Sequence, residues 1–189
     1  MGSKTVILYR VIQGWRASIF EKLSAEEDVN LEVWYGPDFP ETKVVSTKNE
    51  LAFKRRKLWS FRIKLESKNG LIMMPLSPFL FFNLIYKNPK VIICEGASNL
   101  ANSMIAFIYC KVFGKKYIWW SLGKIQGRVY DKKRLSVDKI ITFIERKSDR
   151  IITYSSVGKR YFKSLGIDDD KIIVAVNVID TESKLKEIQ

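Results

Sequence analysis

The chain of 189 residues is long enough for one hydrophobic core, and 47% hydrophobic with 13% aromatic residues is the composition of a folded protein. Lys and Arg outnumber Asp and Glu by 33 to 20, so the net charge of +13 predicts attraction to phosphate-bearing partners such as nucleic acid, anionic lipid or sugar phosphates. The absence of histidine excludes Ser-His-Asp and Cys-His nucleophiles, HExxH zinc sites and histidine general bases.

Short apolar runs recur along the chain without the alternation of a half-exposed strand. Their continuous hydrophobicity is typical of strands that are buried on both faces of a parallel sheet. The sequence predicts such strands at residues 5–9, 31–35, 90–94, 116–120, 150–154 and 171–176.

Helical patterns lie between these runs. Apolar residues spaced by three and four predict helices at residues 15–27, 99–113, 139–147 and 157–165, the last followed by Gly166 at a C-cap position. Alternation of strands and helices is the pattern of an open, doubly wound, Rossmann-like α/β sheet. We therefore expect one domain of this class over residues 1–176.

The segment between the second and third runs is irregular. Residues 58–77 predict two strands joined at Asn69-Gly70, a β-hairpin-like insertion that decorates the sheet or supplies one strand to it. The apolar stretch 71–86 is shorter than the roughly 20 residues of a membrane span and contains Pro75 and Pro78. We expect it not to cross a membrane, although it is suited to lie in an interface.

The chain carries two indications of its compartment. Its first residues lack the basic, apolar and small-residue zones of a signal peptide, which predicts a cytoplasmic protein. Cys94 and Cys110 lie in separate apolar runs without CxxC spacing. We interpret both as reduced thiols in the core of a cytosolic protein.

Polar residues that follow the strands are the candidates for a site, because ligands of doubly wound sheets bind beyond the carboxyl ends of the strands. A carboxylate directly after an apolar strand makes Glu95 either a catalytic group or a strand-end charge, and the sequence leaves both open. The other candidates, for acceptor or phosphate contact, are Arg10, Gln13, Gly14, Ser98, Asn99, Ser121, Lys124 and Ser155. The polar side chains among them also suit helix caps or surface charge. No GxGxxG, P-loop or metal-ligand motif is present.

A basic stretch interleaved with aromatic residues covers residues 53–64. Its candidates for a membrane surface are Lys54, Arg55, Arg56, Lys57, Trp59, Phe61 and Arg62. Rings beside cations suit the headgroup region of an anionic membrane, and they also suit stacking on single-stranded nucleic acid or an ordinary solvated face.

Several segments together resemble a known family. They are YR at residues 9–10, FEKL at 20–23, VNLEVWYG at 29–36, VIICEG at 91–96, KKYIWWSLG at 115–123 and the block at 148–182. The chain resembles the N-terminal, acceptor-side domain of a GT-B glycosyltransferase of the retaining, family 4-like group (glycosyl transferases group 1) that builds bacterial surface polysaccharides. It keeps Asn177 and Asp180 of the family's Pro-Asn-Gly turn but lacks the proline and the glycine.

The resemblance implies one half of a GT-B fold and transfer of a sugar from a nucleotide-diphosphate donor to a lipid-linked glycan acceptor at the inner membrane face. It implies no metal and no cofactor. The donor would bind mainly to a second domain with an EX7E motif, on the same or a separate chain, with residues 177–189 as the start of a linker. This chain alone is then expected to be inactive.

The resemblance also implies roles for particular residues. Glu95, Ser98, Asn99, Ser121 and Lys124 would line the acceptor cleft, and Arg10 and Arg128 would meet phosphate on the acceptor. Two alternatives remain open: a subunit of a split two-chain transferase, and a basic nucleic-acid-binding module, for which no RNP-like or helix-turn-helix signature is present.

Overall fold

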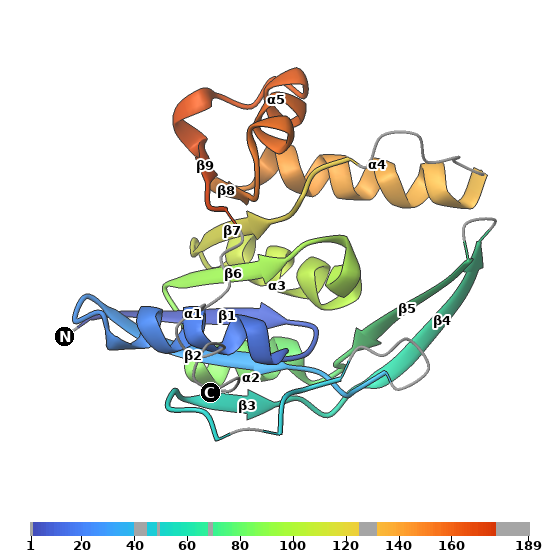
Figure 1. Cartoon of the computed structure of the whole chain (residues 1–189). Helices are drawn as coiled ribbons and strands as arrows, with labels where there is room; N and C mark the ends of the chain where they lie inside the picture. Colours follow the sequence, from blue (N-terminus) through green and yellow to red (C-terminus); the bar gives the residue numbers. More distant parts are fainter. Residues whose placement is uncertain (1, 40–44, 49, 68–69, 125–131, 177–189) are drawn as a thin grey trace, which may run out of the picture.

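The computed structural model describes residues 2–39, 45–48, 50–67, 70–124 and 132–176. Within these ranges, seven parallel strands form one sheet in the order β3-β2-β1-β6-β7-β8-β9 (Figure 1). The elements are β1 (Ser3–Tyr9), α1 (Gly14–Ala25), β2 (Val29–Tyr35), β3 (Arg55–Lys57), β4 (Phe61–Ser67), β5 (Gly70–Leu76), α2 (Leu80–Lys87), β6 (Val91–Glu95), η2 (Ala97–Asn99), α3 (Leu100–Val112), β7 (Lys116–Trp120), α4 (Lys132–Lys147), β8 (Arg150–Thr153), α5 (Ser156–Ser164), η3 (Asp169–Lys171) and β9 (Ile172–Val174). The predicted α/β fold class is confirmed.

The central strands are continuously apolar because both of their faces are covered. In β1, Val6 and Leu8 belong to one hydrophobic cluster, whereas Ile7 and Tyr9 belong to another on the opposite face. All four side chains are buried. The free thiols of Cys94 and Cys110 are buried in the first cluster, as predicted for core cysteines.

Helices lie on both faces of the sheet. Helix α1 packs Ala17 and Phe20 against the cluster of Ile7 and Tyr9. The other cluster receives buried side chains from α2, α3, α4 and α5. Figure 1 shows α1 in front of the sheet and α2 and α3 behind it. This arrangement is the one that doubly wound connections produce.

The predicted hairpin is present as a separate element. Strands β4 and β5 pair antiparallel from Phe61 opposite Leu76 to Ser67 opposite Gly70. The additional strand of the main sheet is β3, which pairs parallel with β2 and has the charged sequence RRK. Figure 1 shows the hairpin reaching past the carboxyl ends of the central strands toward the start of α4.

Helix α2 is an element that the sequence reasoning did not predict. The apolar stretch 71–86 divides at Pro78, with β5 before it and α2 after it. Leu80 and Leu84 of α2 are buried in the core, whereas Phe82 and Tyr86 are exposed. Among the described residues, no helix combines the length and the hydrophobicity that crossing a membrane requires. The predicted linker at 177–189 lies outside the described residues.

The order of the strands reverses between β1 and β6. From β1 the sheet grows through β2 to β3 in one direction, and from β6 through β7 and β8 to β9 in the other. The connections that leave β1 and β6 therefore run to opposite faces, which opens a crevice beyond the carboxyl ends of these strands.

Candidate functional site

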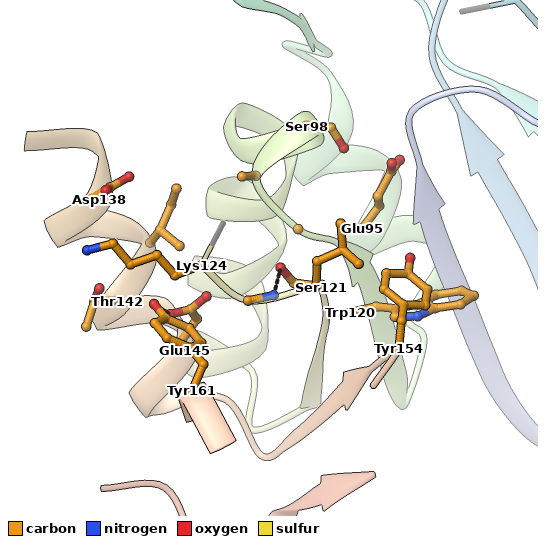
Figure 2. A pocket seen from close by; sticks show the side chains of 15 residues that line it. Glu95, Ser98, Trp120, Ser121, Lys124, Asp138, Thr142, Glu145, Tyr154 and Tyr161 are labelled. Atoms are coloured by element: carbon orange, nitrogen blue, oxygen red, sulfur yellow. Dashed lines mark hydrogen bonds between the residues drawn. The ribbon is translucent and has the colours of Figure 1, made fainter. Parts of the chain in front are cut away.

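A cavity of about 300 Å³ lies beyond the carboxyl ends of β6, β7 and β8, bounded by α4 and α5 (Figure 2). It is lined by Glu95, Gly96, Ala97, Ser98, Trp120, Ser121, Leu122, Gly123, Lys124, Asp138, Ile141, Thr142, Glu145, Tyr154 and Tyr161. Figure 2 shows Glu95, Trp120 and Tyr154 at one end and Asp138, Glu145 and Tyr161 at the other. The volume falls at the lower limit of small-ligand pockets.

Two glycines let the loops around the cavity approach closely. The Gly96 N–H donates to the carbonyl of Trp120 at 2.8 Å, and a Cβ at Gly96 would lie 2.8 Å from the Cβ of Ser121. Gly123 has φ +83°, and a Cβ there would lie 2.7 Å from the Tyr161 ring. A larger side chain at either position would force the cavity wall to move.

Glu95 closes the crevice between β1 and β6. Its Oε2 accepts a hydrogen bond of 2.6 Å from the backbone N–H of Arg10, the residue that follows β1. Burial raises the pKa of Glu95, while hydrogen bonds from Ser98 and from the Arg10 backbone oppose the rise. The carboxyl group is thereby poised to exchange a proton nearer to neutral pH than an exposed glutamate does.

Arg16 forms a buried cation behind the cavity. Its side chain is 1% exposed, and its guanidinium lies 4.6 Å from the ring centre of Trp120 and 5.4 Å from that of Tyr154. Its Nε donates to the Tyr9 hydroxyl at 3.2 Å and its Nη2 to the Tyr154 hydroxyl at 3.3 Å. Both hydroxyls act as acceptors here, so each keeps its own proton for donation. The positive charge of Arg16 also favours ionised Glu95.

Glu145 is a second buried carboxyl group of the site. It is 2% exposed and accepts a hydrogen bond of 3.1 Å from the Tyr161 hydroxyl. Burial raises its pKa to about 7, and the like charge of Asp138 contributes to the rise. Asp138, Thr142 and Glu145 are spaced by four and three residues, so α4 turns all three toward the cavity.

Sequence reasoning identified neither Arg16 nor Glu145, although each carries a signal. Arg16 precedes Phe20 by four residues, and Glu145 follows Ile141 by four, so each charge lies on the apolar side of its helix. A charged residue on the apolar side of a helix is buried when that side packs against the core, and a buried charge requires partners. The position of Arg16 and Glu145 among apolar residues could therefore have identified both as candidates.

Some of the predicted site residues meet in the cavity. Glu95, Ser98, Ser121 and Lys124 line it. The Ser121 hydroxyl accepts a hydrogen bond of 3.1 Å from the backbone N–H of Gly123, which holds the loop after β7 (Figure 2).

Other predicted residues lie elsewhere. Arg10 stacks on Phe39, with its guanidinium 4.4 Å from the ring centre. Asn99 is buried and its Oδ1 accepts from the amide of Asn102 at 3.0 Å, so it faces the fold. Gln13 is the N-cap of α1, and Gly14 is the first residue of that helix, beside Thr47. Ser155 caps α5 by accepting a hydrogen bond of 3.2 Å from the Gly158 N–H. Arg128 lies outside the described residues.

The residues predicted for a membrane surface are mostly exposed. Lys54, Arg55, Lys57, Trp59, Phe61 and Arg62 are open to solvent. Arg56 is different, because it pairs with Glu32 at 3.6 Å and stacks on the buried ring of Trp34. Phe53, in the same stretch, is a core residue of the α1 face.

The lining of the cavity favours a ligand rich in hydroxyl groups. Glu95, Asp138 and Glu145 offer acceptors, and the rings of Trp120 and Tyr154 offer flat apolar faces. Among the described lining residues, Lys124 is the only cation, so these residues offer one charged group to a phosphate. In the described ranges, no three acidic or cysteine side chains gather as a metal site.

Comparison with known proteins finds similarity in structure alone. No protein-family model matches the sequence, and no curated protein matches it. Among solved structures, the UDP-GlcNAc 2-epimerase of Methanocaldococcus jannaschii aligns with a TM-score of 0.58 and 10% identity over 94% of this chain and 46% of its own. The UDP-GlcNAc 2-epimerase of Neisseria meningitidis bound to UDP-GlcNAc aligns with a TM-score of 0.60 and 13% identity, over 100% of this chain and 50% of its own. Anabaena Alr3699/HepE in complex with UDP and glucose aligns with a TM-score of 0.62 and 11% identity, over 98% of this chain and 50% of its own.

These alignments establish the fold. The chain spans about half the length of each of these three structures. At 10–13% identity the likeness concerns architecture and not activity. The chain therefore has the Rossmann-like fold of one half of a GT-B-type protein.

Proposed function

We propose that this chain is the acceptor-side domain of a glycosyltransferase in bacterial surface polysaccharide synthesis. The enzyme would move a sugar from a nucleotide-diphosphate donor to a lipid-linked glycan acceptor. The observation that carries the proposal is the cavity beyond β6, β7 and β8, whose carboxyl groups, hydroxyls and rings suit a sugar. Its position beyond the carboxyl ends of parallel strands is the usual ligand site of such sheets.

The structural neighbours support a connection with nucleotide sugars. Two of them are UDP-GlcNAc 2-epimerases, and Alr3699/HepE was solved with UDP and glucose. Because this chain spans about half of each, the donor nucleotide would bind mainly to the other half, on the same or a separate chain. No cofactor beyond the donor substrate enters the proposal.

Glu95 is proposed as the catalytic group of this half. Its carboxylate would accept the proton of the acceptor hydroxyl while that oxygen bonds to the anomeric carbon and the nucleoside diphosphate leaves. The raised pKa of Glu95 supports this role, since a general base works best when its pKa is close to the working pH. Ser98 and Ser121 would hold neighbouring hydroxyls, and Arg10 would meet phosphate on the acceptor.

A transfer assay on the full-length gene product tests the proposal. The donors are UDP-glucose and UDP-GlcNAc, and the acceptor is farnesyl diphosphate carrying one sugar. We expect a lengthened glycolipid and free UDP, and Glu95→Gln should reduce turnover by at least about tenfold, equivalent to about 1.4 kcal/mol of barrier. Unchanged turnover would reduce Glu95 to a strand-end charge. Formation of a UDP-sugar epimer without transfer would replace the proposal with epimerisation.

The alternative readings predict different results. A split two-chain transferase would show transfer only after a separate donor-binding chain is added. A nucleic-acid-binding module would bind single-stranded RNA at physiological salt, where purely electrostatic binding is weak. We further propose that the domain works at the cytoplasmic face of the membrane, where a lipid-linked acceptor would be found.

A further inference from the structure

We propose that a row of exposed aromatic side chains docks this domain on an anionic phospholipid membrane by entering the headgroup region. The row, termed the aromatic ridge, consists of Trp59, Phe61, Phe79, Phe82 and Tyr86. The inference rests on the proposed function, because it names the surface by which the domain would reach a lipid-linked acceptor.

The five side chains are exposed and lie on two segments that contact each other through Trp59 and Phe79. Their exposed fractions are 62%, 54%, 59%, 68% and 86% in chain order. Phe79, Phe82 and Tyr86 are spaced by three and four residues, which places them on one side of α2. The Trp59 ring lies 4.7 Å from that of Phe61 and 5.7 Å from that of Phe79, between ring centres.

Core packing does not account for this exposure. Helix α2 already packs Leu80 and Leu84 into the core, and both are fully buried. Single exposed apolar residues are normal, but a contiguous apolar patch usually marks an interaction surface. Aromatic rings are also the side chains that favour the boundary between lipid headgroups and hydrocarbon.

The charge around the ridge selects an anionic partner. From Leu51 to Cys94 the sequence contains nine Lys and Arg residues and one acid, Glu66. Exposed Lys57 and Arg62 flank Trp59 and Phe61 in the chain. Two acids interact with cations beside the ridge. Glu32 pairs with Arg56 and with Lys87, which follows Tyr86. Burial would raise the pKa of Asp38, but the charges of Lys57 and Arg62 help to lower it.

The same charge argues against a second copy of the chain as the partner. A symmetric contact would bring two positive surfaces together, which is unfavourable. A membrane accepts protruding rings without a matching groove, and its anionic headgroups attract each nearby cation. An anionic bilayer therefore fits both the shape and the charge of the surface.

A chain of hydrogen bonds connects the ridge to the cavity. Ser60, between Trp59 and Phe61, bonds the hydroxyl of Ser77 at 2.7 Å. The Ser77 N–H donates to Oδ1 of Asn102 at 2.8 Å, and Asn102 donates to Asn99 at 3.0 Å. Ser77, Asn99 and Asn102 are buried. Asn99 ends η2, whose Ala97 and Ser98 line the cavity, so docking would hold the cavity at a fixed place relative to the lipid surface.

Vesicle co-sedimentation tests the proposal on the chain itself. The vesicles are phosphatidylcholine with 30% phosphatidylglycerol, or phosphatidylcholine alone, at physiological salt. We expect binding to the anionic vesicles only, and a loss of at least about tenfold in partitioning for Phe82→Ser/Tyr86→Ser and, separately, for Trp59→Ser. The matched control is Phe143→Ser, which removes an aromatic side chain of α4 that is 56% exposed, and it should bind as wild type does. Circular dichroism checks that each variant is folded.

Fluorescence gives an independent reading of the geometry. Brominated lipid should quench wild-type emission, and Trp59→Phe should abolish most of that quenching. Trp34, Trp119 and Trp120 are buried, and Trp15, which is 36% exposed, belongs to α1 on the opposite face of the sheet from α2.

Equal binding of the ridge variants and wild type would overturn the proposal, since charge alone would then suffice. Absence of vesicle binding, complete displacement by single-stranded RNA, or self-association that the ridge variants abolish would also overturn it. Vesicle binding is measured without donor or acceptor, so its failure is distinct from failure of the transfer reaction.

Discussion

Glu145→Gln should make stability less dependent on pH, because the buried carboxyl of Glu145 binds its proton more tightly in the folded state. Its pKa rises from 4.5 to about 7 on folding, as burial disfavours the ionised form. A group with a raised pKa stabilises the fold fully below its unfolded pKa, and this contribution is lost as pH rises through the folded pKa. Stability from Glu145 should therefore decline between about pH 4.5 and pH 7.

The size of the effect follows from the pKa difference. A shift from 4.5 to about 7 corresponds to about 3.4 kcal/mol, of which about 2.5 kcal/mol is lost between pH 5 and pH 8. The glutamine amide has nearly the same shape and remains neutral, and its carbonyl can accept the hydrogen bond from Tyr161. Relative to the variant, wild type should thus lose about 2.5 kcal/mol over this range.

Urea unfolding at pH 5, 6, 7 and 8, followed by circular dichroism, measures this difference. Glu27→Gln, which removes an exposed carboxylate, controls for the change of one net charge. A wild-type-minus-variant difference that stays constant with pH would refute the reasoning, because Glu145 would then carry the same charge in the folded and unfolded states. A difference that grows in favour of wild type at high pH would show that the sign is wrong.

Three further variants test separate contacts. Gly158→Ala should destabilise by about 1–3 kcal/mol although alanine favours helices, because its Cβ would lie 2.0 Å from Oγ1 of Thr153; a gain in melting temperature would contradict this contact. Asn102→Ala should cost about 1–3 kcal/mol in urea unfolding, since the Ser77 N–H loses its acceptor in a buried place; wild-type stability would mean that another acceptor replaces it. Arg16→Met should raise the pKa of Glu95 further, because the buried positive charge is removed, and an unchanged NMR titration of the Glu95 carboxyl carbon would rule out this coupling.

The fold could be predicted because local patterns determine it. Continuous apolar runs identified β1, β2, β6, β7, β8 and β9, since strands covered on both faces have no polar side. Strand β3 was not predicted, because RRK carries no apolar signal and lies at the edge of the sheet beside β2. Helix α2 was hidden because one apolar stretch contains both a strand and a helix.

The candidate site was predicted in part, because the end of a strand locates the backbone of the residues there but does not determine where their side chains point. Glu95 ends β6, Ser98 follows it, and Ser121 and Lys124 follow β7; all four line the cavity. Asn99 follows the same strand but turns into the fold to meet Asn102.

The wall that α4 and α5 contribute depends on tertiary contacts that no local pattern specifies. Glu145 and Tyr161 are bonded to each other across a sequence separation of 16 residues.

A titration followed by NMR tests the central claim, that the cavity of this half holds the acceptor. The labelled chain would be titrated with farnesyl diphosphate carrying one sugar and, separately, with UDP-GlcNAc, while the backbone amide signals of Gly96, Ser98, Ser121 and Gly123 are recorded. These residues line the cavity. We expect the glycolipid to shift these signals and UDP-GlcNAc to leave them unchanged. Shifts with UDP-GlcNAc alone, or no shift with either compound, would contradict the claim that this cavity holds the acceptor.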